Sequence, residues 1–440
     1  MPTTATTTVA PPQPAPGRGT PRPDVSMRHR TAQATLTVRG PDGRPLAGET
    51  VVVEQTRHRL AFGCIGFDLV DLANREAGAG PDVPAAQQAA DEVLAEQWLA
   101  LFNATTLPFY WGQFEPVRGR PDTARLHHAA RWFADRGVLV KGHPLAWHTE
   151  TAPWLEELTT DEVAAAQTAR ITRDVSTFAD VVRVWDVINE VVIMPVFDKQ
   201  PNGLTRLCWD RGRIPTIRLA FDTARAADPT ATLLLNDFDM STAYECLIEG
   251  CLEAGIAIDA IGLQSHMHQG WWGEERTLEV LDRFARFGLP LHLTETTLLS
   301  GELMPAHIDD LNDHQVASWP STPEGEERQA DEVARHYRTL VSHPAVEAIT
   351  YWGLSDAGMW LGAPGGLVRA DGTPKPAYDA LHGLVKGEWW HAPRTLVTDA
   401  EGQVLVTGFL GDYRVGAGSA SASFTLDAPG AGHVEVRLPA

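Results

Sequence analysis

Hydrophobic and polar positions follow two alternating patterns between residues 60 and 390. Short apolar runs predict buried strands, and the stretches between them repeat their apolar positions every three or four residues, as amphipathic helices do. The strand-like runs are FGCIGF, NATTLPFYW, VLVKGHPLAW, VRVWDVIN, ATLLLNDF, DAIGLQSH, PLHLTE and AITYWGL. The helical stretches include residues 124–136, 161–179, 214–227, 241–254, 278–287 and 326–342. Eight such units predict a (β/α)8 TIM barrel, because doubly wound sheets seldom need so many.

Six of the strand-like runs end in residues that can carry chemistry. In a barrel the active site lies at the carboxyl ends of the strands, so these residues should line one mouth. They are His143, Asn189 with Glu190, Asn236 with Asp237, Gln264 with His266, Glu295, and Trp352. The predicted mouth is therefore polar and carries two glutamates.

The flanks of this region show the period-two alternation of half-buried strands. Residues 34–59 contain two strand-like runs around the turn sequence PDGRPLAG, and residues 391–440 contain several more. Neither flank has enough strands to form a stable sandwich alone. Together, VxGPDGxPLAGxxVxV and TDxxGxVLVxGFLGDYxV resemble the prealbumin-like sandwich of carboxypeptidase regulatory domains. We predict one small β-sandwich split by insertion of the barrel, with loose flanking strands lying on the barrel as the alternative.

The N-terminal segment differs from the rest of the chain. Residues 1–33 are rich in Pro, Thr and Ala without apolar periodicity, which predicts a disordered tail. No basic segment followed by an apolar one is visible there, and no apolar run is long enough to span a membrane, so we expect a cytoplasmic protein. The four cysteines lack metal-binding spacing, and free thiols and one disulfide both stay open.

Charge and aromatic content narrow the choice of ligand. A formal net charge of −21 repels phosphate backbones and anionic surfaces, so we expect no nucleic-acid or membrane partner. The chain contains 14 Trp but only 6 Tyr. A Trp ring offers a flat face for the C–H face of a pyranose, although core packing is its other common use. A neutral ligand such as a sugar fits both observations.

Two glutamates have the placement that glycoside hydrolysis requires. One carboxyl group must protonate the leaving oxygen, and a second must attack the anomeric carbon or activate water. Glu190 in WDVINE and Glu295 in LHLTET each follow a strand-like run, so both should project into the same mouth. A lone glutamate there is more often a structural carboxylate, but two of them, each within a motif, favour catalysis.

The segments around these glutamates resemble glycoside hydrolase family ten, the xylanase family, over about residues 60–385. The matching segments are GHPLAWH (142–148) followed by APWL, WDVINE (185–190), LLLNDF (233–238), IGLQSH (261–266), LTE (293–295), TPEGEERQA (322–330) and YWGLSDAGMW (351–360). The resemblance implies Glu190 as acid/base and Glu295 as nucleophile. It also implies carboxyl groups about 5–5.5 Å apart, net retention, and no metal or organic cofactor.

The resemblance assigns further residues to the substrate. Asn189 matches the amide that binds the sugar 2-hydroxyl, and His266, with Gln264 beside it, matches the imidazole that holds the nucleophile. The walls around the sugar match His143, Trp147, Trp352 and Trp360. The acid/base must be protonated near neutral pH, so apolar walls and the nucleophile's charge should raise its pKa.

One segment departs from the family on the non-reducing side. After the second strand the family carries T-P-E-N-x-x-K-W, whose Glu, Asn and Lys bind sugars. Here those three positions are Thr106, Leu107 and Tyr110, with Trp111 retained. These mostly apolar and aromatic side chains leave sugar hydroxyls without hydrogen-bond partners, which costs about 1–3 kcal/mol of binding free energy for each unsatisfied polar group. We expect Tyr110 and Trp111 to contact substrate and a long xylan chain to bind poorly on this side.

A second departure lies after the sixth and seventh strands. The family's T-E-L-D is TETT here (294–297), which removes a carboxylate. The preceding loop carries Trp271 and Trp272. Two interpretations stay open for this pair: a platform for a flat or hydrophobic leaving group, or a surface pair packed on a neighbouring helix.

Several functions compete for this sequence. The leading interpretation is a retaining, endo-β-1,4-xylanase-like β-glycosidase acting on xylo-oligosaccharides or related short glycosides. Release of a glycan from a plant secondary-metabolite aglycone is a variant of it. A non-catalytic carbohydrate-binding barrel is the alternative from another class, and the intact glutamate pair argues against it. Adhesion through the sandwich ranks last, because its aromatic residues Phe409, Tyr413 and Phe424 fit a core. The oligomeric state is not determined.

Overall fold

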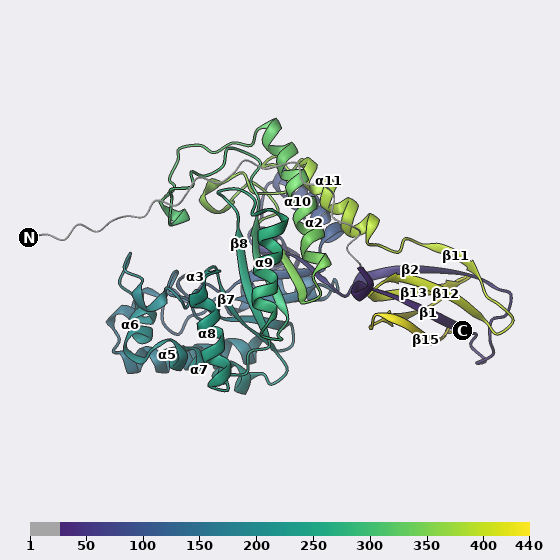
Figure 1. Cartoon of the computed structure of the whole chain (residues 1–440), viewed down its shortest axis with the longest axis horizontal. Coiled ribbons are helices and arrows are strands. Elements are labelled where there is room, and N and C mark those ends of the chain that lie inside the picture. Colours follow the sequence, from purple (N-terminus) through teal and green to yellow (C-terminus); the bar gives the residue numbers. More distant parts are fainter. Residues whose placement is uncertain (1–26) are drawn as a thin grey trace, which may run out of the picture.

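The computed structural model describes residues 27–440, and eight parallel strands form a closed barrel within them (Figure 1). Their order is β10-β3-β4-β5-β6-β7-β8-β9, which confirms the predicted (β/α)8 fold. Parallel strands are joined by crossover helices that cover the barrel, and strands buried on both faces have the continuous apolar runs seen in the sequence. The barrel strands are β3 (Ala61–Ile65), β4 (Ala104–Pro108), β5 (Leu139–His143), β6 (Val182–Asn189), β7 (Thr232–Asp237), β8 (Ala260–His266), β9 (Leu291–Thr297) and β10 (Val346–Tyr351).

The helices surround this barrel. Helix α5 illustrates why they form: Thr159 and Glu162 make a capping box at its N-terminus, and one face buries apolar side chains such as Val163 and Phe178. The α-helices are α1 (Val70–Glu76), α2 (Ala85–Leu101), α3 (Trp111–Phe114), α4 (Thr123–Ala134), α5 (Thr160–Phe178), α6 (Gly203–Arg211), α7 (Arg213–Ala227), α8 (Thr242–Glu253), α9 (Gly273–Ala285), α10 (Pro323–Ser342) and α11 (Pro376–His382). Short 3-10 turns add η1 (Met27–Arg30), η2 (Phe67–Leu69), η3 (Pro153–Glu157), η4 (Met194–Val196), η5 (Leu311–Asp313) and η6 (Trp360–Gly362), and a π-helical turn, η7 (Gly383–Glu388), follows α11.

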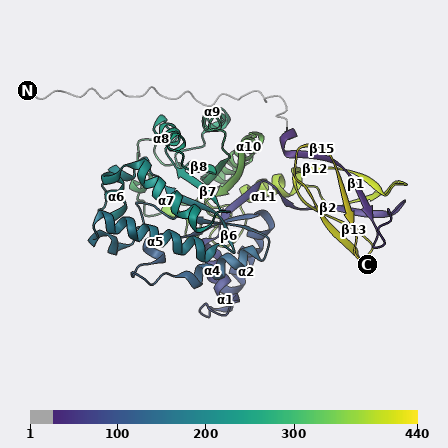
Figure 2. The same ribbon diagram turned by 90° about the horizontal axis from the view of Figure 1, so that it is seen from below.

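The flanking segments meet beside the barrel in two sheets, ordered β12-β1-β15 and β11-β2-β13-β14 (Figure 2). Their inward side chains form a separate buried core that includes Leu36, Val53, Tyr413 and Phe424. Loose strands lying on the barrel would not share a core of their own, so the split sandwich describes the structure better. Its likeness to prealbumin stays a prediction. The strands are β1 (Thr31–Arg39), β2 (Thr50–His58), β11 (Arg394–Val397), β12 (Gln403–Phe409), β13 (Gly411–Ala417), β14 (Ala420–Leu426) and β15 (Gly430–Arg437).

The predicted tail of residues 1–33 is only partly described. Residues 1–26 lie outside the described part, whereas residues 27–33 belong to η1 and β1, so the ordered chain begins earlier than expected. Arg30 gives the physical reason, because its guanidinium donates to three carbonyl oxygens at the base of the barrel. The acceptors are Val341 at 3.1 Å, His343 at 2.8 Å and Val346 at 2.6 Å.

The structure also bears on the state of the cysteines and on membrane-spanning helices. All four cysteines, Cys64, Cys208, Cys246 and Cys251, are free, which decides between thiols and a disulfide. Within residues 27–440, no helix has the length and apolar character needed to cross a membrane.

Candidate active site

Glu190 stands at the carboxyl end of β6 in an unusual backbone conformation. Its φ of 55° lies in the left-handed region, which costs a residue with a side chain about 1–2 kcal/mol. The backbone N–H of Glu190 donates to the carbonyl oxygen of Asn236 on β7, at 2.9 Å. This bond holds the turn that aims the carboxyl group into the mouth of the barrel.

The carboxyl group of Glu190 is held by three neutral donors. Trp147 Nε1 donates to Oε2 at 2.7 Å, and Gln264 Nε2 and Asn189 Nδ2 each donate to Oε1 at 3.1 Å. Burial raises the pKa of Glu190 to about 8, and the negative charge of Glu295 adds to the effect, against the opposing bonds from Gln264 and Trp147. Glu190 is therefore protonated at neutral pH.

Glu295, near the end of β9, has a different set of partners. His266 Nε2 donates to Oε2 at 3.1 Å, Asn236 Nδ2 donates to Oε1 at 2.9 Å, and His143 Nε2 lies 4.0 Å from Oε1. Burial acts to raise the pKa of Glu295, but His143 and His266 outweigh it, so the pKa lies below its usual value. Glu295 is therefore ionised at neutral pH, beside a protonated Glu190.

A chain of amides fixes the orientation of the donors between the two carboxyl groups. Thr294 Oγ1 donates to Asn236 Oδ1 at 2.6 Å, which turns the Asn236 amide so that its Nδ2 faces both Glu295 and Asn189 Oδ1 at 2.7 Å. Asn189 Oδ1 is then an acceptor, so its Nδ2 points to Glu190. This places the Asn189 N–H group at the mouth, where a sugar hydroxyl would lie.

A buried ion cluster lies beneath the site. Asp186 is fully buried on β6, and its Oδ2 accepts from Lys141 Nζ at 2.8 Å and His143 Nδ1 at 2.7 Å. Burial acts to raise the pKa of Asp186, yet Lys141 and His143 hold it at about 2. The Asp186 carboxylate thus orients the His143 ring that faces Glu295, because it binds the ring nitrogen on the side away from Glu295.

Aromatic rings wall the mouth beside the carboxyl groups. Tyr110 lies 5.7 Å from the rings of both His143 and Trp147, and Trp352 lies 5.2 Å from His143. Phe67 closes the gap, at 6.0 Å from Tyr110 and 5.9 Å from Trp352. These rings come from the ends of β3, β4, β5 and β10, and we call them the aromatic wall. The ring of Trp360 lies 4.9 Å from that of His266 on the other side.

The structure does not bring Trp111 to the mouth. Trp111 is 3% exposed and packs in a separate core cluster with Leu155 and Leu204, and its Nε1 donates to Glu115 at 3.2 Å. This packing gives no support to its expected contact with substrate, because the Trp111 ring at the start of α3 lies in that core cluster.

Trp271 and Trp272 have the contacts of the packing alternative. Trp271 Nε1 donates to His336 Nδ1 on α10 at 3.2 Å, and the Arg335 guanidinium lies over its ring at 4.5 Å. The Arg276 guanidinium on α9 lies over the Trp272 ring at 5.4 Å. These contacts are with residues of the outer helices α9 and α10, and they favour the packing interpretation over a leaving-group platform.

The sequence placed Asn236 at the mouth without assigning it a role, and it did not single out four other residues of this site. Asn236 donates to Glu295, and Asp186 accepts from His143 and Lys141. Phe67 completes the aromatic wall, and Thr297 Oγ1 lies 3.0 Å from His266 Nδ1. Asn236 and Asp186 lie within the strand motifs already noted, so their position was a signal. Thr297 occupies the place of the family's missing carboxylate and still contacts the imidazole.

The arrangement supplies one protonated and one ionised carboxyl group in a single buried mouth, which is what a two-step displacement at an anomeric carbon needs. Among residues 27–440 there is no group of three or more His, Cys, Asp or Glu side chains arranged to hold a metal ion. The chemistry follows from the two carboxyl groups and their hydrogen-bond donors.

Comparisons with known proteins show the family of the chain. A family model described as Glycosyl hydrolase family 10 matches residues 85–383. Endo-1,4-beta-xylanase B of Thermotoga neapolitana is 28% identical over 294 residues, covering 63% of this chain and 78% of the relative. An endo-1,4-beta-xylanase/feruloyl esterase of Xylanibacter ruminicola is 27% identical over 299 residues, 59% of this chain but only 39% of its own length.

Solved structures show the same fold. Xylanase 10B of Thermotoga petrophila, solved in complex with xylobiose, superposes with a TM-score of 0.60 at 22% identity, covering 75% of this chain and 95% of that one. A family 10 enzyme of Paenibacillus barcinonensis gives a TM-score of 0.59 at 24% identity, covering 75% and 96%.

Proposed function

The chain belongs to glycosyl hydrolase family 10, whose members are retaining glycoside hydrolases, and from this premise we propose that it cleaves short β-1,4-linked xylosides with Glu190 as acid/base and Glu295 as nucleophile. The observation that carries the assignment is the difference in surroundings: an indole and amides donate to Glu190, whereas the imidazoles of His143 and His266 lie beside Glu295. Glu190 has a pKa raised to about 8 and Glu295 a lowered one, in the same mouth. Two carboxyl groups held apart in this way are the signature of an acid and a nucleophile.

In the first step, the ionised Glu295 attacks the anomeric carbon while Glu190 gives its proton to the departing glycosidic oxygen. The C–O bond to the leaving group breaks, and an ester bond to Glu295 forms. Burial still raises the pKa of Glu190, but the charge of Glu295 that added to this effect is now lost, so the pKa of Glu190 falls and Glu190 serves as the base. It takes a proton from water, whose oxygen attacks the anomeric carbon and releases Glu295. Two inversions give net retention.

The amide of Asn189 supports the charge that develops at the sugar. Its Nδ2 is turned toward the mouth by Asn236 and Thr294, so it can donate to the sugar 2-hydroxyl without reorganising in the transition state. Glu190, Glu295 and Asn189 thus work as one preorganised set.

The substrate class follows from the aromatic wall. Thr106 and Leu107 are buried on β4 and stand where the family has a Glu and an Asn that bind sugars, so the wall presents rings on the non-reducing side. A ring binds the C–H face of one sugar well but leaves hydroxyls of a long chain unpaired. Short xylo-oligosaccharides and related short glycosides therefore fit better than a polymer. The xylanase names of the relatives support xylose as the sugar.

The assignment is tested with 4-nitrophenyl β-xyloside, 4-nitrophenyl β-glucoside, xylo-oligosaccharides and polymeric xylan. We expect turnover of the aryl xyloside and the oligosaccharides, and loss of it in Glu295→Ala. Azide added to Glu295→Ala should give the α-xylosyl azide, and azide added to Glu190→Ala the β-xylosyl azide, because each anion takes the place of a different carboxylate. Glu435→Ala, on the exposed face of the sandwich, is the matched control. Full activity of Glu295→Ala would refute the nucleophile, and no turnover of any glycoside would favour a binding protein.

A further inference from the structure

Residues 301–320 connect β9 to α10 in one long loop, which we call the strap. Apart from the single turn η5, it has no helix, and loops of this length inside compact domains usually serve a function. The strap leaves the barrel just after the strand that carries Glu295. In Figure 1 it forms the long green loops above the barrel, next to α10.

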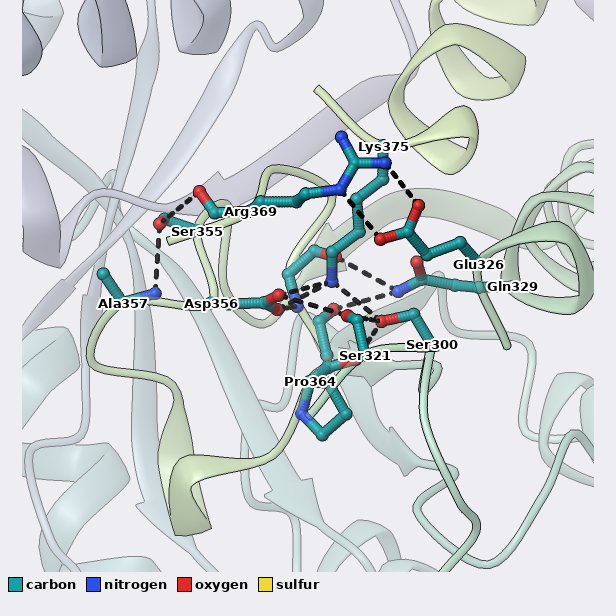
Figure 3. A network of polar contacts seen from close by, with 12 residues as sticks. Ser300, Ser321, Glu326, Gln329, Ser355, Asp356, Ala357, Pro364, Arg369 and Lys375 are labelled. Carbon is teal, nitrogen blue, oxygen red and sulfur yellow. Dashed lines mark hydrogen bonds and ion pairs between the residues drawn. The ribbon is translucent and has the colours of Figure 1, made fainter. Parts of the chain in front are cut away.

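The base of the strap is fixed by a buried polar network (Figure 3). Ser300 and Ser321, on either side of it, join through their hydroxyl groups at 2.6 Å. Lys375, which is 0% exposed, donates to Ser300 Oγ at 2.8 Å and to the Asp356 carboxylate at 2.7 and 2.8 Å. Gly325 permits this closeness, because a Cβ there would lie 2.1 Å from the carbonyl oxygen of Ser300. The two ends of the strap are thus held together by hydrogen bonds to each other and to the buried Lys375–Asp356 ion pair.

The middle of the strap lies on the loop that follows β8. The backbone N–H of Met304 donates to the carbonyl oxygen of His268 at 2.9 Å, and Gln269 Nε2 donates to the carbonyl oxygen of Ile308 at 2.7 Å. The ring of Trp319 packs 6.2 Å from His268, whose ring lies 5.8 Å from His266. The strap therefore contacts the layer that supports Glu295.

The far end of the strap is joined to the opposite loop by an exposed clasp. Lys199 Nζ, in the loop after β6, lies 2.6 Å from Asp310 and 2.7 Å from Asp313. In the same loop, the Phe197 ring packs 4.4 Å from His148, whose Nε2 is 3.9 Å from Glu190. The clasp thus joins the loops that follow the two strands with the catalytic glutamates. In the barrel β7 and β8 lie between those strands, and the strap contacts the loop after β8.

The strap and its clasp bound one side of the mouth. The aromatic wall occupies the half formed by β10, β3, β4 and β5, where the sugar with the anomeric carbon would lie. The leaving group must then extend over the other half, from β6 to β9, which is the half whose loops the strap contacts. We propose that the strap and its Lys199 clasp form a barrier on the leaving-group side that restricts cleavage to bonds with a short leaving group.

This inference rests on the proposed function, and Lys199 is its specificity-determining residue. The two ends of the strap differ in strength. Exposed ion pairs contribute about 0–1 kcal/mol and weaken with salt, whereas breaking a buried pair costs about 3–5 kcal/mol. The Lys199 side chain is 44% exposed and Lys375 is fully buried, so the clasp opens while the base stays closed.

The experiment compares kcat/KM for polymeric β-1,4-xylan with that for 4-nitrophenyl β-xyloside, using the full chain. In Lys199→Ala the polymer-to-aryl ratio should rise about two- to fivefold, the factor equivalent to an exposed pair, while the aryl rate stays unchanged. Lys199→Arg should keep the wild-type ratio. Replacing residues 305–318 by a Gly-Ser linker should raise the ratio further. Arg414→Ala, which breaks an exposed pair with Glu54 in the sandwich, is the control.

Salt gives a second readout that needs no variant. Raising the ionic strength from about 0.05 to 0.5 M should raise the polymer-to-aryl ratio in the wild type and leave it constant in Lys199→Ala. If the wild type and every strap variant have the same ratio, the barrier is refuted while the proposed function stands. If none of them cleaves any glycoside, the proposed function fails and the barrier fails with it.

Discussion

Glu190 and Glu295 are the same residue type in one mouth, yet their surroundings give them opposite protonation states. Glu190 is bonded by an indole and two amides, all neutral, and burial dominates, so its pKa rises to about 8. Glu295 is more deeply buried, with 6% of its side chain exposed against 14% for Glu190, but it faces the imidazoles of His143 and His266, and its pKa falls below the usual value.

The difference shows that the kind of donor, rather than the depth of burial, separates an acid from a nucleophile. The neutral donors around Glu190 favour its charged form too weakly to offset burial, whereas His143 and His266 beside Glu295 favour the charged form strongly enough to outweigh burial. The following variants exchange or remove donors on one side of the comparison while leaving the other intact.

Removing the nucleophile should have the largest effect. Glu295→Ala should lower kcat/KM on xylo-oligosaccharides about 10⁴- to 10⁶-fold, as loss of a nucleophile does elsewhere. Glu190→Ala should lower it about 10²- to 10⁴-fold and should have a much smaller effect on an aryl xyloside, whose leaving group needs little protonation. Equal losses on both substrates would contradict the division of roles.

Removing donors to Glu295 should come next. His266→Ala and Asn236→Ala each take a hydrogen bond from a buried carboxylate, at about 1.5–3 kcal/mol, or roughly 10- to 100-fold in kcat/KM. The variants should also raise the pKa of Glu295, so the acid limb of the pH–rate profile moves to higher pH. In His266→Ala the alkaline limb serves as the internal control, because Glu190 keeps its donors, whereas Asn236→Ala also frees the Asn189 amide that donates to Glu190.

The pH profile tests the other carboxyl group. Glu190 must be protonated in the free enzyme, so kcat/KM should fall as the pH rises through about 8. The Trp147 bond opposes the raised pKa of Glu190, so Trp147→Phe should shift the alkaline limb to higher pH, with a loss at neutral pH of about 0.5–1.5 kcal/mol, or a few-fold. A shift to lower pH would contradict the sign of this interaction.

Thr297 should give the smallest effect. Its hydroxyl contacts His266 Nδ1 at 3.0 Å, so it acts on Glu295 only through that ring. Thr297→Val should lower kcat/KM about two- to tenfold and move the acid limb, whereas Thr297→Ser should match the wild type. An unchanged acid limb in Thr297→Val would show that Glu295 does not depend on this contact.

The sequence predicted the barrel, the sandwich and the residues that stand at strand ends, because period and motif carry that information. Glu190, Glu295 and His266 each follow an apolar run directly, and their positions in the mouth needed no knowledge of long-range packing. Their catalytic roles stay predictions until the variants are measured.

The other residues depended on geometry that no pattern shows. Tyr110 and Trp111 are adjacent and both aromatic, and only the start of α3 at Trp111 decides which ring reaches the mouth. The role of Asn236 comes from partners on two other strands, Asn189 and Thr294. Lys199 lies in a polar loop, and its partners are more than a hundred positions away along the chain.

The split sandwich has a consequence for how the chain folds. Strand β1 lies between β12 and β15, and β2 lies between β11 and β13, so both are inner strands without any neighbour from their own end of the chain. During synthesis β1 and β2 therefore stay unpaired until the segment with β11 to β15 has been made. Barrel closure shortens that wait, because it brings His58 to 5.0 Å from Trp390 and bonds it to the carbonyl oxygen of Val385 at 2.7 Å. The barrel thus converts a very long loop closure into a short one, and the sandwich completes last.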